Sequence, residues 1–303
     1  MLAAFRGWWD RQPGNFRGIF WVGLSGIMFA LLNAATLYPA QHLNPWMMSF
    51  LRYCFGPLFF FALIPLTRTR FSPRTRKLPL HAGRAVLHAG GITLWFIALP
   101  HVDLAGITAL GFTGPIFVII GAALFLREAV SGERWLVVLL GFVGALIILR
   151  PGFVEISLFV LAALGSAPLF AGSNLIAKHL ARTETAGTIV FWQNVWIPVF
   201  CLPMAYLHWQ PILPADLLIL IFAGLLGTLG HLVMQRGYQI ADLTALQPIG
   251  FLALVWNALF GFVFFGQRPD VWTFIGAAVI FGSATYFSRR EQRRRAATLP
   301  PRD

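Results

Sequence analysis

Charged side chains are scarce in this chain. Asp, Glu, Lys and Arg together make up 11% of its 303 residues, whereas a soluble globular domain carries about 25%. Hydrophobic types make up 58%, and the mean hydropathy is +0.73. This composition argues against a soluble enzyme, a disordered protein and a nucleic-acid-binding domain. The two cysteines, Cys54 and Cys201, both lie in apolar stretches and indicate neither a disulfide framework nor a metal site.

Acidic side chains are missing from the interior of the apolar stretches. The eleven acids lie at the ends of those stretches, in loops or in tails, so a buried carboxylate relay for proton or sodium coupling is not predicted. The sequence has no GxxxxGK[ST] phosphate loop, no HExxH motif and no Ser/His/Asp arrangement. These absences argue against ATP drive and against metal or nucleophilic catalysis. We therefore expect no enzyme activity, no catalytic residue, no metal and no cofactor.

The chain does contain a series of apolar stretches separated by short loops. Crossing the hydrocarbon core of a bilayer takes about 20 apolar residues, and most of the stretches approach that length. They predict an all-α polytopic membrane protein with ten transmembrane helices. The expected spans are Gly18–Tyr38, Pro45–Leu66, His81–Leu99, Leu104–Leu126, Trp135–Leu149, Ile156–Ala177, Thr188–Leu207, Ala215–Met234, Leu243–Phe265 and Val271–Phe287.

Basic residues are distributed unevenly between the loops. With the N-terminus in the cytoplasm, 19 of the 23 Lys and Arg residues lie on the cytoplasmic side, and only Arg150 and Arg268 lie outside. Short loops of membrane proteins are richer in Lys and Arg on the cytoplasmic side. The net charge of +12 therefore indicates topology, with both termini cytoplasmic, rather than a nucleic-acid partner. The expected partners are the lipid bilayer and a small-molecule substrate, and the oligomeric state is left open.

Two halves of five helices would have opposite orientations, because the first span starts in the cytoplasm and the sixth starts outside. Sparse identities support this division. At a common offset of 139 residues, Asp103-Leu104 matches Asp242-Leu243 and Gly111-Phe112 matches Gly250-Phe251. Inverted repeats are a common plan of secondary transporters, with the substrate site near the midplane. The predicted units are residues 18–151 and 152–288, between a cytoplasmic segment 1–17 and an Arg-rich cytoplasmic tail 289–303.

One stretch, Ile107–Pro151, reads ITALGFTGPIFVIIGAALFLREAVSGERWLVVLLGFVGALIILRP and resembles the EamA-type module of the drug/metabolite transporter superfamily. In that family a helix with a mid-membrane proline ends in an acidic residue, and a Trp-led helix with glycines follows. The matching residues are Pro115, Glu128, Trp135, Gly141 and Gly144. The stretch Met48–Tyr53, with Arg52, is also similar to the family. The second unit departs from the pattern, because Gly266-Gln267 stands where the family usually has Gly-Glu.

The resemblance implies a ten-helix carrier of small metabolites, often working outward. Bacterial members of the family include exporters of amino acids, among them aromatic ones. Other members carry riboflavin-like, S-adenosylmethionine-like or sugar-nucleotide cargo. The resemblance by itself does not choose among these substrates.

Polar side chains within the expected spans are candidates for the substrate site, because such groups must face the bundle interior or a wet cavity. On several helices they share one face; Ser25, Phe29, Asn33 and Thr36, for example, lie within about 80° of one another. Hydrogen bonding between dry packed helices is the alternative interpretation for each. The cavity candidates are Ser25, Phe29, Asn33, Thr36, Arg52, His88, Trp95, Ser166, Asn174, Thr228, His231, Gln235, Thr244 and Gln247.

Two arginines lie inside the expected spans. Arg52 is about 10 Å from the outer end of its helix by helical rise. It either binds a substrate carboxylate or clamps backbone carbonyls between the halves, and the resemblance favours the clamp because the family tends to have a basic residue here whatever the cargo. Arg84 is expected to extend to the cytoplasmic surface. His88 and His231 are candidates for proton exchange.

Other positions have simpler expected roles. Asp103 and Asp242 each precede an apolar helix and are expected to cap it. Trp192 and Trp196 are interpreted as anchors in the interfacial aromatic belt. Four prolines remove helix hydrogen bonds and are hinge candidates: Pro115, Pro168, Pro198 and Pro248.

These observations predict a secondary carrier in the bacterial inner membrane that opens a central cavity alternately to each side. The expected cargo is a small zwitterion with an apolar or aromatic side chain, such as an exported amino acid, because no fixed charge is expected in the cavity. One alternative is import or exchange of a larger aromatic metabolite or a drug cation, although a cation would favour an embedded acid. The other is an integral-membrane enzyme acting on lipids, which would need polar groups clustered at one interface.

Overall fold

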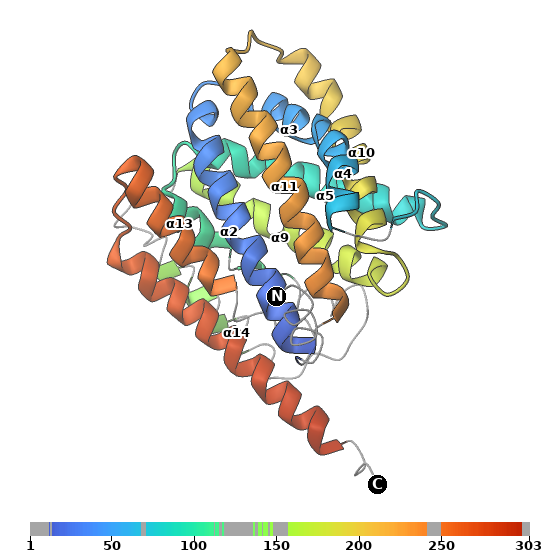
Figure 1. The fold of residues 1–303 in the computed structure, drawn as a ribbon. Coiled ribbons are helices and arrows are strands. Elements are labelled where there is room, and N and C mark those ends of the chain that lie inside the picture. Colours follow the sequence, from blue (N-terminus) through green and yellow to red (C-terminus); the bar gives the residue numbers. More distant parts are fainter. Residues whose placement is uncertain are drawn as a thin grey trace, which may run out of the picture.

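The computed structural model describes residues 12, 14–67, 71–111, 157–240 and 250–298, together with scattered positions between 113 and 147. These residues form helices joined by short connections (Figure 1). The helices are α2 (Gly14–Ala40), α3 (Pro45–Cys54), α4 (Gly56–Thr67), α5 (Leu78–Ala98), α6 (Leu104–Gly111), α9 (Leu158–Leu180), α10 (Ala186–Leu207), α11 (Pro214–Ile240), α13 (Gly250–Phe265) and α14 (Val271–Thr298).

Most of the helix bounds lie close to the ends of the expected spans where the residues are described. Among the described residues, five stretches are long and apolar enough to cross a membrane: Phe16–Ala40, Pro45–Pro65, Leu158–Leu180, Ala186–Leu207 and Pro214–Ile240. One difference is at the C-terminal end, where α14 continues to Thr298, well into the Arg-rich segment. The expected all-α class is therefore confirmed for the described part of the chain.

The most extensive helix contacts in the bundle join one half of the chain to the other. The first helix of the N-terminal half, α2, packs most extensively against α11, and the two run side by side in Figure 1. The first helix of the C-terminal half, α9, packs most extensively against α5. α2 and α9 are the first spans of their halves, and α5 and α11 are the third spans. The first span of each half therefore packs against the third span of the other half, as the symmetry of an inverted repeat requires. Neither half therefore buries its third helix on its own.

Close backbone approach holds α11 against α3. A Cβ atom built on Gly224 would lie only 2.9 Å from the carbonyl oxygen of Arg52. Glycine removes the side chain that would keep the two helices apart, which is how small residues promote packing between membrane helices.

The second expected span is two helices rather than one. α3 ends at Cys54 and α4 begins at Gly56. The cause is Pro57, which has no backbone N–H to donate to the carbonyl of Tyr53, one turn earlier. Asn194 of α10 packs directly at this break, because a Cβ atom on Gly56 would lie 2.6 Å from its side chain. Breaks of this kind in transporters occur where helices surround a binding site.

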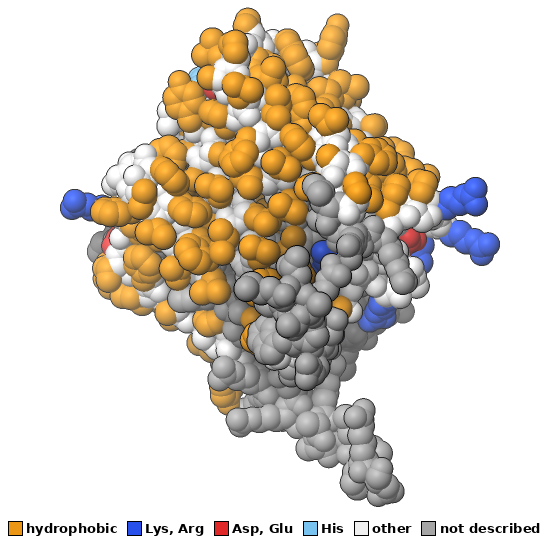
Figure 2. Space-filling view, viewed as in Figure 1, with side chains coloured by type: hydrophobic (Ala, Val, Ile, Leu, Met, Phe, Trp, Pro, Cys, Tyr) orange, Lys and Arg blue, Asp and Glu red, His pale blue; other side chains and the backbone are white. Residues whose placement is uncertain are grey.

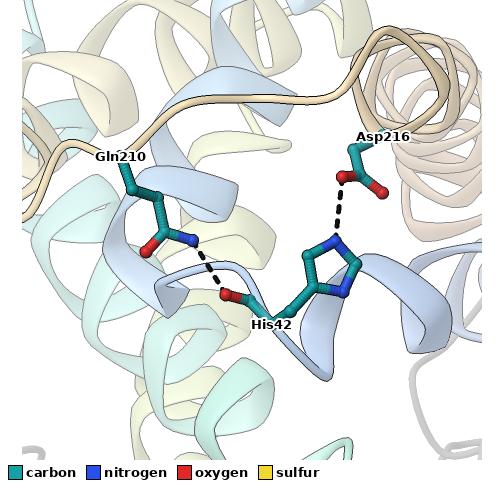
Figure 3. A network of polar contacts seen from close by, with 3 residues as sticks. All are labelled: His42, Gln210 and Asp216. Carbon is teal, nitrogen blue, oxygen red and sulfur yellow. Dashed lines mark hydrogen bonds and ion pairs between the residues drawn. The ribbon is translucent and has the colours of Figure 1, made fainter.

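Loops gather at two opposite ends of the bundle. At one end, Thr75 donates a hydrogen bond to Glu184 over 2.6 Å, and Lys77 donates one to Thr183 over 2.9 Å. At the other end, the loop after α2 meets the segment between α10 and α11 through His42 (Figure 3). Loops expected on one side of the membrane therefore do lie together, while the side that each group faces stays a prediction.

The exterior of the bundle is apolar. In Figure 2 hydrophobic side chains cover most of the described surface, and Lys and Arg lie at its margins. Fully apolar residues with more than half of their surface exposed include Leu58, Leu158, Leu207 and Leu218. Exposed apolar area on this scale is unusual for a soluble monomer. It is the surface expected of a protein surrounded by lipid.

Candidate substrate site

A hydrogen-bonded network lies at the centre of the bundle. His88 of α5 has its Nε2 atom 2.8 Å from the Tyr53 hydroxyl and its Nδ1 atom 3.3 Å from the Ser173 hydroxyl. The amide nitrogen of Gln193 lies 3.1 Å from Nε2 of His231 and 3.5 Å from Nε2 of His88. Tyr53, His88, Ser173, Gln193 and His231 come from α3, α5, α9, α10 and α11. We call these five residues the central network.

With the Gln193 amide oriented as it is in the structure, the hydrogen-bond pattern favours one proton position on each imidazole. The Gln193 amide nitrogen can only donate, so Nε2 of His231 accepts and its proton lies on Nδ1. If the Tyr53 hydroxyl donates to Nε2 of His88, the Nδ1–H of that ring donates to Ser173. Both rings are then neutral. Nδ1 of His231 and the amide oxygen of Gln193 have no hydrogen-bond partner, so the network has free donor and acceptor capacity.

Aromatic rings surround the central network. Phe29 of α2 meets His231 edge-on at 4.9 Å between centroids, and Phe170 of α9 meets His88 at 5.1 Å. Trp95 packs against Phe170 at 6.2 Å. The arrangement combines flat apolar faces with hydrogen-bonding edges. This is the combination that protein sites use to bind small aromatic molecules.

A second group of buried polar side chains lies along α11, and its part beside the break between α3 and α4 is the pair Asn194 and Thr228. Asn194 donates a hydrogen bond to the Thr228 hydroxyl over 3.4 Å. Gln235, two turns further along α11, is fully buried, and neither its amide nitrogen nor its oxygen has a partner. Buried amides are nearly always satisfied in proteins. An amide with both ends free therefore points to a group that the described residues do not supply.

Two arginines are buried beside the network. Arg52 is 3% exposed and its guanidinium lies 4.6 Å from the centroid of the Tyr53 ring. Arg84 is 1% exposed and donates one hydrogen bond, 3.2 Å long, to the carbonyl of Ile189. The expectation that Arg84 extends to the cytoplasmic surface is therefore wrong. The expectation of an interior without fixed charge is wrong for the same reason.

Comparison with known proteins identifies the family of this chain. The chain matches the EamA-like transporter family over residues 16–150 and again over residues 157–289. The chain belongs to this family. It is 34% identical over 288 residues to a riboflavin transporter of Rhizobium johnstonii, covering 91% of this chain and 92% of that protein. It is 27% identical to an S-adenosylmethionine uptake transporter of Rickettsia felis, covering 94% and 96% of the two chains.

A solved structure shares the fold. It aligns with a TM-score of 0.62 at 18% identity, and the alignment covers 89% of this chain and 98% of the other. Together with the double family match, this confirms the predicted class, an all-α polytopic membrane protein of the drug/metabolite transporter superfamily built from two inverted five-helix repeats. The chain is a multi-pass membrane protein whose relatives transport small molecules.

The family assignment makes it possible to sort the residues expected from the sequence. Phe29, Arg52, His88, Trp95 and His231 lie in or beside the central network. Thr228 and Gln235 belong to the adjoining polar group. His231 is only 5% exposed.

Other expected residues lie in helix packing instead. The hydroxyls of Ser25, Thr36 and Ser166 donate to carbonyl oxygens of their own helices. Asn33 donates to Asn257 over 3.2 Å and thereby joins α2 to α13. Asn174 is half-buried on α9, directly after Ser173.

The prolines and the remaining candidates divide by whether they are described. Pro168 and Pro198 lie within continuous helices, α9 and α10. Four of the predicted positions lie outside the described residues: Thr244, Gln247, Pro115 and Pro248. Pro57, which does interrupt a helix, was not among the expected hinges.

Three members of the network were not among the predicted cavity residues: Tyr53, Ser173 and Gln193. The residue type of Gln193 could have indicated its role. Gln193 and Asn194 are adjacent amides within an otherwise apolar helix, where unpaired amides are costly. Tyr53 follows Arg52 directly, but the sequence alone does not show that its hydroxyl meets a histidine 35 residues away.

The cap residues tie the repeats together at the end of α6. Asp103 accepts a hydrogen bond from the backbone N–H of Gly106, as an N-cap does, which confirms its predicted role; Asp242 lies outside the described residues. Burial raises the pKa of the Asp103 carboxyl. The amide oxygen of Gln267 accepts from Leu104 N–H over 3.0 Å. The residue that replaces the usual acid in the second repeat therefore caps a helix of the first.

Proposed function

We propose that this protein is a secondary carrier of a small aromatic metabolite, bound at the central network and moved by alternating access between the two repeats. The observation that carries the proposal is the joining of Phe29, Phe170 and Trp95 with the imidazole and amide edges of His88, Gln193 and His231. Rings offer stacking surface to a flat cargo, and the edges offer hydrogen bonds to its heteroatoms.

Riboflavin is the first cargo to test. The relative with 34% identity is named a riboflavin transporter, and a second riboflavin transporter, from Vibrio cholerae, is 31% identical over 92% of this chain. An isoalloxazine ring is flat, uncharged and lined with hydrogen-bonding atoms, which matches the groups around His88 and His231. A drug cation fits less well, because an acidic side chain is absent from the described part of the central network.

An aromatic amino acid is the second candidate. The observation that favours it is Arg52, a buried cation whose Nε atom has no hydrogen-bond partner and which could receive a carboxylate. Such a cargo would retain the amino-acid export expected from the sequence. Outward transport, the inner-membrane location and the cytoplasmic termini belong to the same proposal, and the distribution of Lys and Arg supports the placement of the termini.

The helix break beside Arg52 supplies a place for movement. In the described arrangement the central network is buried on all sides, so a cargo reaches it only when helices of the two repeats separate. α3 and α4 meet at Phe55, and Phe55 N–H still donates to Leu51 over 3.3 Å. Half-helices of this kind let one half rotate while the other stays packed.

The test is transport by purified protein in liposomes. Labelled riboflavin and labelled tryptophan are offered separately, with and without a pH gradient, to the wild type and to Gln193→Ala. We expect saturable uptake of at least one label, and a loss of more than tenfold in Gln193→Ala because both imidazoles lose their amide donor. The exposed loop variant Arg74→Gln serves as the matched control. Absence of uptake of both labels by folded protein would reject an aromatic cargo.

A further inference from the structure

Within the part of the chain that the structure describes, two guanidinium groups inside the bundle have no acidic partner. Arg52 and Arg84 are 3% and 1% exposed. Among the described residues, the four acids whose side chains are placed are Asp103, Glu184, Asp216 and Asp270, and none forms an ion pair with either arginine. A buried charge is costly unless it is paired. Two such charges in one protein interior call for an anion.

One guanidinium group lies a helical turn from His88 of the central network, and the other lies over the ring of Tyr53, the hydrogen-bond partner of His88. Arg84 precedes His88 by four positions on α5, which places the two side chains on one helix face. Arg52 lies over the ring of Tyr53, whose hydroxyl contacts His88. Both arginines are close enough to His88 and His231 for their charges to act on each ring. The two charges therefore act on one region.

Several donors in this region are free. Nε of Arg52, together with Nε and Nη2 of Arg84, has no hydrogen-bond partner. Nδ1 of His231 and the Gln235 amide nitrogen are also without one. Native proteins satisfy the large majority of buried donors. Four of these donors belong to Arg52, Arg84 and His231, and together they indicate a ligand that accepts hydrogen bonds and carries negative charge.

We propose that Arg52 and Arg84 form an anion subsite beside the central network, which receives a carboxylate or phosphate group of the cargo. The subsite rests on the proposed function, and within that function it favours an aromatic metabolite with an anionic group over uncharged riboflavin. Guanidinium suits this role because its planar set of N–H donors matches both carboxylate and phosphate. The subsite also disfavours cationic cargo through repulsion.

A packing role for the arginines makes the opposite prediction. The hydrogen bond from Arg84 to the Ile189 carbonyl joins α5 to α10, and Arg52 fits against Gly227 with Nη2 2.7 Å from where a Cβ atom would stand. If the two side chains only hold helices together, removing their charge lowers stability but does not change which cargo is preferred.

The experiment compares ligands that differ by one anionic group. Riboflavin is paired with riboflavin 5′-phosphate, and tryptamine is paired with tryptophan. Binding to purified protein is followed by the ligand-induced rise in melting temperature, and transport by competition against a labelled cargo. We expect the anionic member of at least one pair to bind about 10- to 100-fold more tightly. The pair that responds distinguishes a phosphate from a carboxylate.

The variants are Arg52→Gln, Arg84→Gln and the charge-conserving Arg52→Lys, with Arg74→Gln as an exposed control. The ratio of the affinities for the anionic and the non-anionic member of a pair should fall towards one in both glutamine variants. It should be partly retained in Arg52→Lys and unchanged in Arg74→Gln. If Arg52→Gln does not fold, Arg84→Gln and Arg52→Lys distinguish the anion subsite from a packing role. Equal binding within both pairs, or an unchanged preference in folded glutamine variants, would overturn the subsite. Anion-dependent binding without transport of any aromatic compound would reject the proposed function and keep the subsite.

Discussion

Nε2 of His42 lies 2.8 Å from Oδ2 of Asp216, and this contact joins the two repeats at one end of the bundle (Figure 3). His42 belongs to the loop between α2 and α3, and Asp216 lies in the first turn of α11. Gln210 strengthens the junction by donating to the His42 carbonyl over 2.8 Å. The carboxylate is fully buried, and its other oxygen has no partner, so the imidazole is the partner on which it depends.

His42→Ala should therefore destabilise the protein more than Asp216→Asn does. Removing the imidazole leaves a buried carboxylate without its partner, which costs about 1–3 kcal/mol or more, whereas an amide at position 216 keeps a hydrogen-bonding group without a buried charge. Melting temperatures in detergent measure both, and His42→Ala should lie several degrees lower. Equal melting temperatures for the two variants would show that the contact does not hold the repeats together.

Two serines of α9 separate the central network from ordinary helix packing. Ser173 lies 3.3 Å from His88, whereas the Ser166 hydroxyl donates to the carbonyl of Ala163 in its own helix. Ser173→Ala removes the partner of the imidazole and should lower transport severalfold. Ser166→Ala, the same change two turns earlier on the same helix, should leave transport within about twofold of wild type. Similar losses in both variants in the liposome assay would remove Ser173 from the site.

Much of the fold was predictable from the sequence, because apolar length and the placement of basic residues report directly on how a chain meets a bilayer. The site was predictable only in part. His88 and His231 stand out because polar groups within spans are rare, but Gln193 joins them through contacts between helices that no local pattern encodes. Arg84 illustrates the limit: its position near a helix end favours a route to water, and packing against α10 buries it instead.

Gly224 offers a test of the close approach between α11 and α3. A Cβ atom there would meet the Arg52 carbonyl at 2.9 Å, which is backbone and has little freedom to move, whereas a Cβ atom on Gly26 would meet nothing within 4 Å. Gly224→Ala should lower the melting temperature and reduce transport, because α3 carries Arg52 and Tyr53. Gly26→Ala should be neutral or stabilising, because alanine is the better helix former. A neutral Gly224→Ala in the same melting assay would contradict the packing described for these helices.

Asp103 gives the protein a pH-dependent stability whose sign can be worked out. Burial raises the pKa of this carboxyl in the folded state, so between its unfolded value, about 3.9, and the higher folded value the folded protein binds more protons than the unfolded chain. The stability that Asp103 contributes is thus fully present below the unfolded pKa and is lost as the pH rises through the folded pKa. Asp103→Asn keeps an N-cap and should flatten this dependence. Melting curves of both proteins above about pH 4 provide the measurement, and parallel curves would show that Asp103 does not titrate in this range.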